Sequence, residues 1–213
     1  ALTEGADLKC TSEATAHDAS SASGYPATMK DALIVSALSL LPRKSGARGM
    51  GWFARTRAST WITRTFVSVY GLNMDEAVGS VSDYPTLDAL FTRELKPGAR
   101  PIDDHPDALV SPVDGRVARV ATTAHGMVDM ADGRPLNLAE LVGHKIDGER
   151  DVVVLYLSPK DYHRIHIPRE GRAVAWNYRP GTLWPVFPAA VRKITNLFAL
   201  NERATVRIDT DHG

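Results

Sequence analysis

The stretch VVVLYL, from Val152 to Leu157, is the clearest strand signal in the chain. An uninterrupted apolar run of this length is typical of a strand buried on both faces. From Leu109 to Leu157, other short Val- and Leu-rich runs are separated by turn signals at Pro112 to Gly115, Asp132-Gly133 and Asp147-Gly148. This alternation predicts a β-rich, mostly antiparallel body.

The segment before this body has the pattern of amphipathic helices. Between Ala32 and Met74 there is no Asp or Glu. Ile62, Phe66 and Val69 have the i, i+4, i+7 spacing that places side chains on one face of a helix. Pro42 and the glycines at positions 46, 49 and 51 are expected to break the segment into a helical hairpin. The same segment carries Arg43, Lys44, Arg48, Arg55, Arg57, Arg64, Trp52, Phe53, Trp61 and Tyr70.

Apolar helix faces with tryptophans and unopposed basic residues suit a helix lying in an anionic membrane surface. Two core-packing helices with a solvated basic face would give the same pattern, so both interpretations stay open. A further helix is predicted from near Thr86 to Pro97-Gly98. Its apolar positions are Leu87, Leu90, Phe91 and Leu95.

The predicted fold is therefore α+β, with three parts. Residues 1–28 are rich in Ala, Ser, Thr and Gly and are expected to form a disordered extension. Residues 29–100 form the helical, membrane-docking region, and residues 101–213 form the β-rich domain.

Composition excludes several classes of protein. The 213 residues are 44% hydrophobic and 23% charged, with 25 basic and 25 acidic side chains, so nucleic acid is not expected as a partner. The longest apolar run, Ala32 to Leu41, is shorter than the ~18 residues that span a bilayer, so any membrane contact should be peripheral. The single Cys10 excludes an internal disulfide framework and a Cys-based zinc site.

Three clusters of polar residues could carry chemistry. In the first, Asp114 precedes a glycine in a tight turn, where a carboxylate often caps the turn itself. In the second, Asp161, His163 and His166 follow the strongest strand, which is compatible with catalysis, with a metal pair or with structural hydrogen bonds. The third is Asn201-Glu202-Arg203, for which a salt-bridged turn is the simpler interpretation. No Walker loop, GxGxxG or GxSxG motif occurs, which disfavours nucleotide cofactors and α/β-hydrolase chemistry.

Read together, four ordered motifs resemble the phosphatidylserine decarboxylase family, of the bacterial and mitochondrial type made as a proenzyme. They are FTRELKPGARPI at 91–102, SPVDGRV at 111–117, YLSPKDYHRIHIP at 156–168 and NLFALNER at 196–203. The resemblance implies conversion of phosphatidylserine to phosphatidylethanolamine and CO2. The cofactor would be a pyruvoyl group, formed when a proenzyme serine in a Leu-Gly-Ser-Thr motif cleaves the chain.

The resemblance also implies residue roles. Asp114 resembles the acid that orients a histidine base, His166 resembles that base, and His163 resembles the histidine used in decarboxylation. No metal is implied. Because the sequence contains no Leu-Gly-Ser-Thr, and Gly79-Ser80 precedes all four motifs, we expect it to be most of the β-chain portion, inactive without a pyruvoyl-bearing α chain.

The expected partners are that α chain and phosphatidylserine in the membrane, with peripheral contact through residues 32–74 on the cytoplasmic face of the cell membrane. The resemblance leaves a homodimer of αβ units open. Two alternatives also remain: a non-catalytic lipid-binding relative, and a pyruvoyl-dependent decarboxylase of a soluble amino acid. A biotinyl or lipoyl carrier is disfavoured, because Lys145 lacks the Met or Asp neighbours that carrier lysines have.

Overall fold

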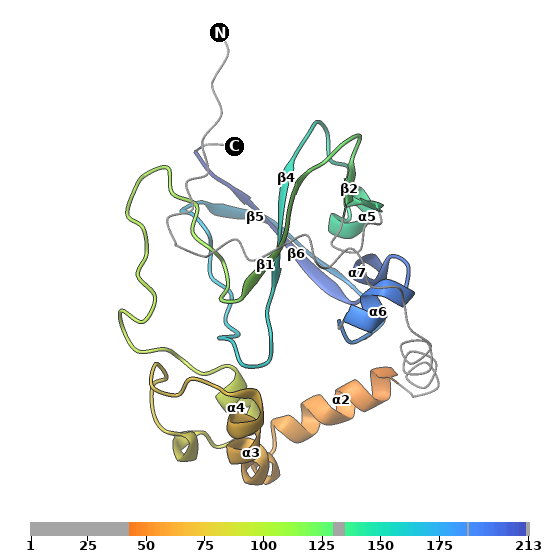
Figure 1. The fold of residues 1–213 in the computed structure, drawn as a ribbon. Coiled ribbons are helices and arrows are strands. Elements are labelled where there is room, and N and C mark those ends of the chain that lie inside the picture. The colour runs from red at the N-terminus through yellow and green to blue at the C-terminus, as the bar shows by residue number, and fades with distance from the viewer. Residues whose placement is uncertain (1–42, 130–134, 187, 212–213) are drawn as a thin grey trace.

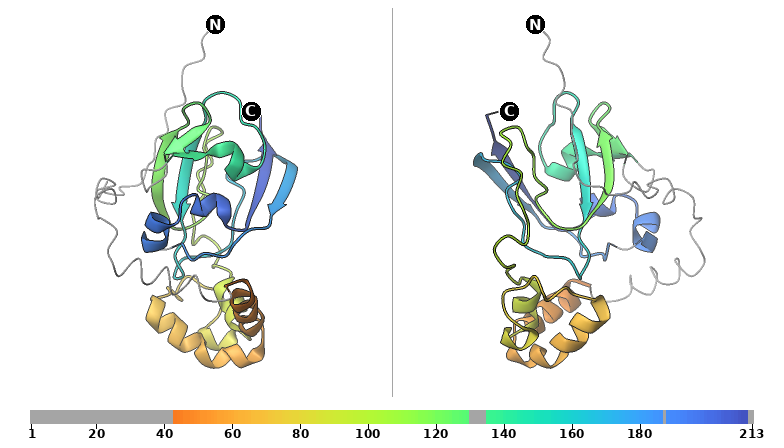
Figure 2. Two further views of the ribbon diagram at one scale, coloured as in Figure 1. Left: turned by 90° about the vertical axis from the view of Figure 1, so that its right-hand side faces the viewer. Right: turned by 60° about the vertical axis from the view of Figure 1, so that its left-hand side comes forward.

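The computed structural model describes residues 43–129, 135–186 and 188–211. The helices nearest the N-terminus form one lobe, and the strands and remaining helices form a second (Figure 1). The two further views keep this division (Figure 2). The predicted extension at residues 1–28 and the predicted turn at Asp132-Gly133 lie outside the described residues.

The helical lobe contains α2 (Arg43–Ala54), α3 (Thr60–Tyr70) and α4 (Leu87–Phe91), with short 3-10 helices at Arg57–Ser59 and Val81–Asp83. Two helices are present as predicted, but the expected position of the break between them is wrong. Helix α2 continues through the glycines at 46, 49 and 51, because glycine lowers helix propensity without blocking the backbone hydrogen bonds. The turn comes after Ala54, where Thr56 donates through its backbone N–H and its hydroxyl to the carbonyl oxygen of Phe53.

Helix α3 turns only part of its predicted apolar face inward. Thr63 is buried and Phe66 is half-buried, whereas Val69, on the predicted apolar face, is 71% exposed. The inner face is instead centred on Thr63 and on Ser59, the residue that precedes the helix. The fully buried Ser59 hydroxyl accepts a hydrogen bond from the backbone N–H of Leu87 at 2.8 Å, which ties α3 to the first turn of α4.

Helix α4 begins as predicted. The Thr86 hydroxyl accepts a hydrogen bond from the N–H of Ala89 at 3.0 Å, as an N-cap residue does, and Leu90 is fully buried. The predicted end at Pro97-Gly98 is wrong, because the helix ends at Phe91. Leu95 instead forms an antiparallel bridge with Ala77, and that pairing requires extended backbone.

In the part that the structure describes, the second lobe contains three antiparallel strand pairs and three short helices. Strand β1 (Arg116–Thr122) pairs with β4 (Asp151–Tyr156), β2 (Met127–Asp129) with β3 (Pro135–Asn137), and β5 (Arg172–Arg179) with β6 (Arg203–Asp209). Helix α5 (Leu138–Val142) follows β3, and α6 (Pro188–Lys193) and α7 (Leu197–Leu200) precede β6. Helices together with antiparallel sheets confirm the predicted mixture of α and β structure.

The core of this lobe lies where β1, β4, α5 and α7 meet the small β2–β3 sheet. Val128 is fully buried and Leu136 is 3% exposed. The partly buried side chains packed against them are Ala121, Leu141, Val152, Val154, Phe198 and Ala199. Val153 faces away from this cluster and is 46% exposed, so the prediction that VVVLYL is buried on both faces is wrong. In the described residues, packed elements cover one face of the β1–β4 ladder.

Candidate active site

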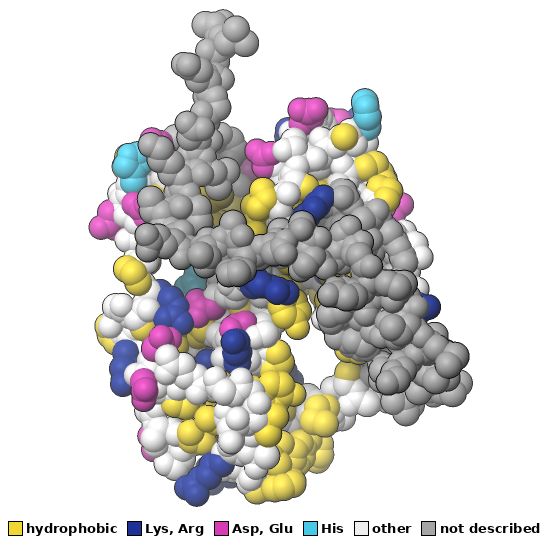
Figure 3. All heavy atoms as spheres, in the orientation of Figure 1, with side chains coloured by type: hydrophobic (Ala, Val, Ile, Leu, Met, Phe, Trp, Pro, Cys, Tyr) yellow, Lys and Arg dark blue, Asp and Glu magenta, His cyan; other side chains and the backbone are white. Residues whose placement is uncertain are grey.

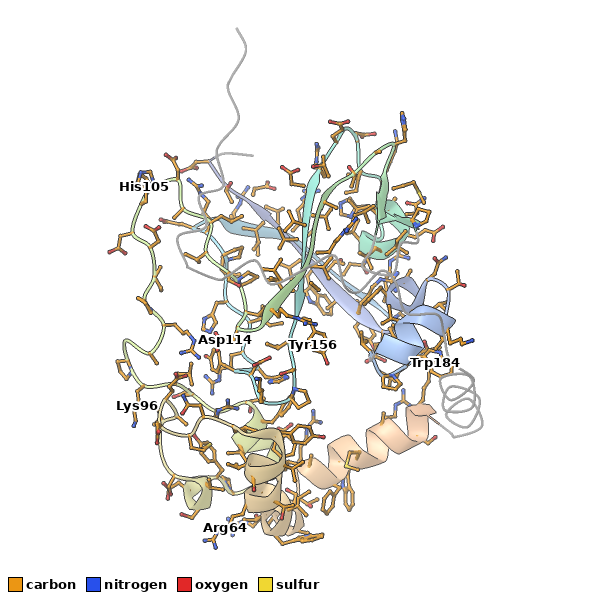
Figure 4. The ribbon with its side chains drawn as sticks, in the orientation of Figure 1. Arg64, Lys96, His105, Asp114, Tyr156 and Trp184 are labelled. Atoms are coloured by element: carbon orange, nitrogen blue, oxygen red, sulfur yellow. The ribbon has the colours of Figure 1, made fainter. Side chains whose placement is uncertain are left out.

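The first and second polar clusters meet at one end of the β1–β4 ladder (Figure 4). Gly115 has a φ of +127°, and a Cβ at this position would lie 2.5 Å from the carbonyl oxygen of Tyr156. Only glycine permits both this conformation and this close approach. The backbone therefore brings Asp114 next to the last residue of β4, where residues 157–168, here called the histidine loop, begin.

Two backbone hydrogen bonds hold the histidine loop beside the segment that leads to Asp114. The N–H of His166 donates to the carbonyl oxygen of Pro112 at 2.7 Å, and the N–H of Val110 donates to that of Pro168 at 2.9 Å. Residues about fifty positions apart in the sequence are thus neighbours. Asp114, His163 and His166 come from two segments that lie side by side.

The Asp114 carboxylate is held by an arginine that sequence reasoning did not single out. Arg100 donates from Nε to Oδ1 at 2.9 Å and from Nη2 to Oδ2 at 2.6 Å. Arg100 also donates from Nη2 to Glu76 in the helical lobe at 2.8 Å. These hydrogen bonds, those to Asp114 above all, raise the pKa of Arg100. The only sequence signal for this bidentate interaction is that Arg100 lies within the first of the four motifs.

The hydrogen bond of His163 defines which ring nitrogen can exchange a proton. Its Nδ1 lies 2.8 Å from the carbonyl oxygen of Asp161. Because a carbonyl oxygen only accepts hydrogen bonds, Nδ1 carries the proton, and Nε2 is the atom left to gain or lose one. The Asp161 carboxylate accepts hydrogen bonds from the N–H and hydroxyl of Ser158, so this acid closes the turn of the loop.

His166 interacts with Tyr162, four positions before it in the histidine loop. Its Nε2 lies 3.0 Å from the Tyr162 hydroxyl, and the two rings are stacked with centroids 5.5 Å apart. Tyr162 is 8% exposed, whereas His166 is exposed. Among the described interactions, the Asp114 carboxylate bonds to Arg100 and the His166 ring to Tyr162. The two side chains are therefore neighbours through their backbones, without a direct hydrogen bond.

The third cluster holds the fold together. The Asn201 side chain accepts from the N–H of Trp184 at 2.9 Å and donates to its carbonyl oxygen at 2.8 Å. Arg203, instead of pairing with the neighbouring glutamate as expected, donates to the carbonyl oxygens of Leu141 at 2.6 Å and Glu140 at 2.7 Å. Burial lowers the pKa of Arg203. These contacts join α5 to the start of β6 at a distance from Asp114.

Within the described residues, no group of three or more His, Cys, Asp or Glu side chains is placed to hold a metal ion.

Comparison with known proteins identifies the family. A family profile described as phosphatidylserine decarboxylase matches residues 87–213, which contain all four sequence motifs. The chain belongs to the phosphatidylserine decarboxylase family. The match begins at the first residue of α4, so α2 and α3 precede the region that the phosphatidylserine decarboxylase profile covers.

Individual family members align over more of the chain. A phosphatidylserine decarboxylase proenzyme from Anaeromyxobacter sp. (strain K) is 39% identical over 193 residues, which are 87% of this chain and 68% of that protein. A proenzyme of the same name from Shewanella amazonensis is 40% identical over 183 residues, which are 82% of this chain and 64% of that protein. The resemblance inferred from the motifs is confirmed, and the chain spans about two thirds of the length of these decarboxylase proenzymes.

Proposed function

We propose that this chain is the β-chain part of a phosphatidylserine decarboxylase, which converts phosphatidylserine to phosphatidylethanolamine and CO2 through a self-generated pyruvoyl group. The observation that carries the proposal is the meeting of the Asp114 turn and the histidine loop at one end of the β1–β4 ladder in a member of this family. The serine that forms the pyruvoyl group would belong to the α-chain part.

Self-cleavage requires a base, because a serine hydroxyl is a weak nucleophile until its proton is removed. We assign this role to His166, whose ring is exposed beside the Asp114 turn. Asp114 would orient the His166 ring and stabilise its charged form, as the carboxylate of a Ser-His-Asp triad does. To do so, the Asp114 carboxylate would give up at least one of its hydrogen bonds from Arg100.

Decarboxylation requires a proton donor at the carbon that loses CO2. We assign this role to His163, whose Nε2 is the nitrogen left to exchange a proton. Two imidazoles and a carboxylate at an accessible end of the ladder fit the acid and base needs of a pyruvoyl enzyme. When present, the pyruvoyl group supplies a carbonyl that accepts the electron pair released with CO2.

The helical lobe supports a peripheral membrane contact. Helices α2 and α3 carry the exposed apolar side chains Met50, Trp52, Trp61 and Val69, and hydrophobic atoms gather along the lower part of this lobe (Figure 3). Arg64 lies at the lower, outer edge of this lobe (Figure 4). Interfacial tryptophans with arginines suit an anionic bilayer surface. No helix in the described residues is long and apolar enough to cross a bilayer. We propose that this lobe rests on the cytoplasmic face of the membrane.

The catalytic assignment is tested in protein made from the complete open reading frame. Asp114→Ala and His166→Ala should block self-cleavage, so a denaturing gel should show one uncut chain. His163→Ala should still be cut at least in part, yet should release no CO2 from phosphatidylserine vesicles. The control is His105→Ala, because His105 is exposed and lies on a loop away from Asp114 (Figure 4). Normal cutting of the Asp114 or His166 variant would refute the assignment.

The two alternative functions give different results in the same assays. A non-catalytic relative would bind vesicles but would leave wild-type protein uncut. A decarboxylase of a soluble amino acid would be cut, but would release CO2 from free amino acids in preference to the phospholipid.

The membrane contact is tested by flotation with vesicles that contain anionic phospholipid. Trp61→Ala should weaken binding about tenfold, since moving a large apolar side chain out of water contributes roughly 1.5 kcal/mol or more. Trp176→Ala is the matched control, because Trp176 is 69% exposed but lies on β5 in the other lobe. Equal binding by both variants would refute the assigned face.

A further inference from the structure

The segment that leaves α4, residues 91–94, packs against the turn of the histidine loop at residues 160–164. Phe91 contributes an aromatic ring, Arg93 a buried guanidinium and Glu94 a carboxylate. Each of them contacts a different part of the turn. The helical lobe is therefore joined to the loop that carries His163 through side chains that sequence reasoning did not assign to the site.

Phe91 lies directly against His163. The two ring centroids are 3.8 Å apart and the ring planes are tilted by 38°. The imidazole thus has an aromatic face on one side and the hydrogen bond from Nδ1 to the Asp161 carbonyl oxygen at its edge. These two contacts oppose rotation of the ring in different directions, and together they define where Nε2 points.

Arg93 contacts the backbone of the turn in which the carbonyl oxygen of Asp161 accepts the hydrogen bond from His163. Its Nη2 donates to the carbonyl oxygen of Lys160 at 3.1 Å and lies 3.5 Å from that of Asp161. Arg93 is only 3% exposed, and its Nε and Nη1 have no hydrogen-bond partner among the described residues. Burial lowers the pKa of Arg93. A cation buried with so few partners costs stability, and the hydrogen bonds of Arg93 within the described residues go to the backbone of this turn.

Arg164 fastens the other side of the turn. Its Nε donates to the carbonyl oxygen of Thr92 at 2.8 Å, and its Nη1 donates to a carboxylate oxygen of Glu94 at 2.9 Å. In the sequence, His163 lies between Asp161 and Arg164. The carbonyl oxygen of Asp161 lies within hydrogen-bonding distance of Arg93, and Arg164 donates to Thr92 and Glu94.

The contact on His163 continues into helix α3. Phe91 meets Phe66 edge-on at 6.2 Å, and Phe66 packs against Tyr70 at 4.6 Å. These aromatic rings form a row from α3, the helix proposed to contact the membrane, to the histidine loop. Phe91 is the member of the row that contacts His163.

We propose that Phe91 is a positioning residue for decarboxylation: its ring holds the His163 imidazole so that Nε2 keeps one orientation, while Arg93 fixes the turn beneath it. This inference rests on the proposed role of His163. Self-cleavage is assigned to His166 and Asp114, which Phe91 does not contact in the described interactions. Loss of the Phe91 ring should therefore affect turnover far more than self-cleavage.

The test compares Phe91→Leu, which keeps apolar volume but removes the flat ring, with Phe91→Tyr, which keeps the ring. Both are made in the complete protein. Phe91→Leu should be cut to the wild-type extent, with kcat for phosphatidylserine decarboxylation about tenfold lower and KM unchanged, as expected when a reacting group is misplaced. Phe91→Tyr should keep kcat at the wild-type value. Phe198→Leu is the matched control, since Phe198 packs against the Val128 cluster in the other lobe.

A second measurement is independent of turnover. The imidazole ¹⁵N signals of His163, identified by their loss in His163→Gln, should show a proton fixed on Nδ1 in wild-type protein and a mixture of tautomers in Phe91→Leu. An unchanged kcat and unchanged tautomer in Phe91→Leu would overturn the proposal. So would parallel losses of kcat in Phe91→Leu and Phe198→Leu, which would mean that packing in general is at issue.

The same measurement separates this proposal from the proposed function. If wild-type protein released no CO2 while Phe91→Leu still lost the Nδ1 tautomer, the function would fail and the positioning of His163 by Phe91 would be supported.

Discussion

Replacement of Gly115 by alanine tests whether the contact of Gly115 with Tyr156 places the Asp114 carboxylate. At Gly115, φ is +127° and a Cβ would lie 2.5 Å from the carbonyl oxygen of Tyr156 and 3.4 Å from the Cα of Leu157. Carbon and oxygen atoms rarely approach closer than about 3.3 Å. The turn and the end of β4 must therefore separate by about 0.8 Å, and both neighbours are backbone atoms that cannot rotate away.

The expected effect is large for self-cleavage. A shift approaching 1 Å in a reacting group can cost about 100-fold in rate, so Gly115→Ala should slow self-cleavage by about 10- to 100-fold. The unfavourable φ should also lower the free energy of unfolding by about 1 to 3 kcal/mol. The rate is measured as the time course of chain cutting on a denaturing gel after cell-free synthesis of the complete protein.

Gly126→Ala is the control for the backbone conformation alone. Gly126 has a φ of +76°, and nothing lies within 4 Å of the position of its Cβ. This variant should lose a similar amount of stability but should be cut at the normal rate. Equal cutting rates in Gly115→Ala and Gly126→Ala would refute the argument that the contact with Tyr156 places Asp114.

Three further predictions concern stability. Asn201→Ala leaves the N–H and carbonyl of Trp184 without their side-chain partner, so the free energy of unfolding in urea should fall by about 1 to 3 kcal/mol; no loss would show that water replaces the amide. Hydrogen bonds from the N–H and hydroxyl of Ser80 lower the pKa of Asp83 below 3.8. The stability that Asp83 contributes is therefore present above pH 3.8 and is lost as the pH falls through its lowered folded-state pKa. Asp83→Asn should flatten the acid side of a plot of unfolding midpoint against pH, and a parallel curve would contradict this. Leu90→Ala removes a fully buried side chain and should cost about 2 to 5 kcal/mol in thermal or urea unfolding; a loss below about 1 kcal/mol would mean that the site collapses around the alanine.

The sequence predicted the kinds of secondary structure better than their limits. The start of α4 at Thr86 was predictable because an N-cap is a local interaction between neighbouring residues. Its early end was not, because Leu95 pairs with Ala77, eighteen positions earlier. The prediction that β4 is buried on both faces was wrong for a related reason. A run of valines shows that both faces are apolar, but it does not show whether packed elements cover one face or both.

The site shows the same division. Asp114, His163 and His166 were identified by their motifs, but their proximity depends on hydrogen bonds between segments about fifty residues apart. Arg100, which bonds to Asp114, and Phe91, which packs against His163, both lie in the first motif, but the sequence pattern indicated no role for them at the site. Both act through contacts across the chain, to Asp114 and His163, and local pattern contains no information on such contacts.

The three separate strand pairs of the described residues have a consequence for which strands could join them. A two-stranded sheet has unpaired N–H and C=O groups along both outer edges, and such edges invite strands of other molecules. Arg116, Arg172 and Arg207 are exposed on strands β1, β5 and β6. An added strand would bring its side chains beside these guanidinium groups, and carboxylates placed opposite them would stabilise the pairing. The edges would therefore favour an added strand whose charges match.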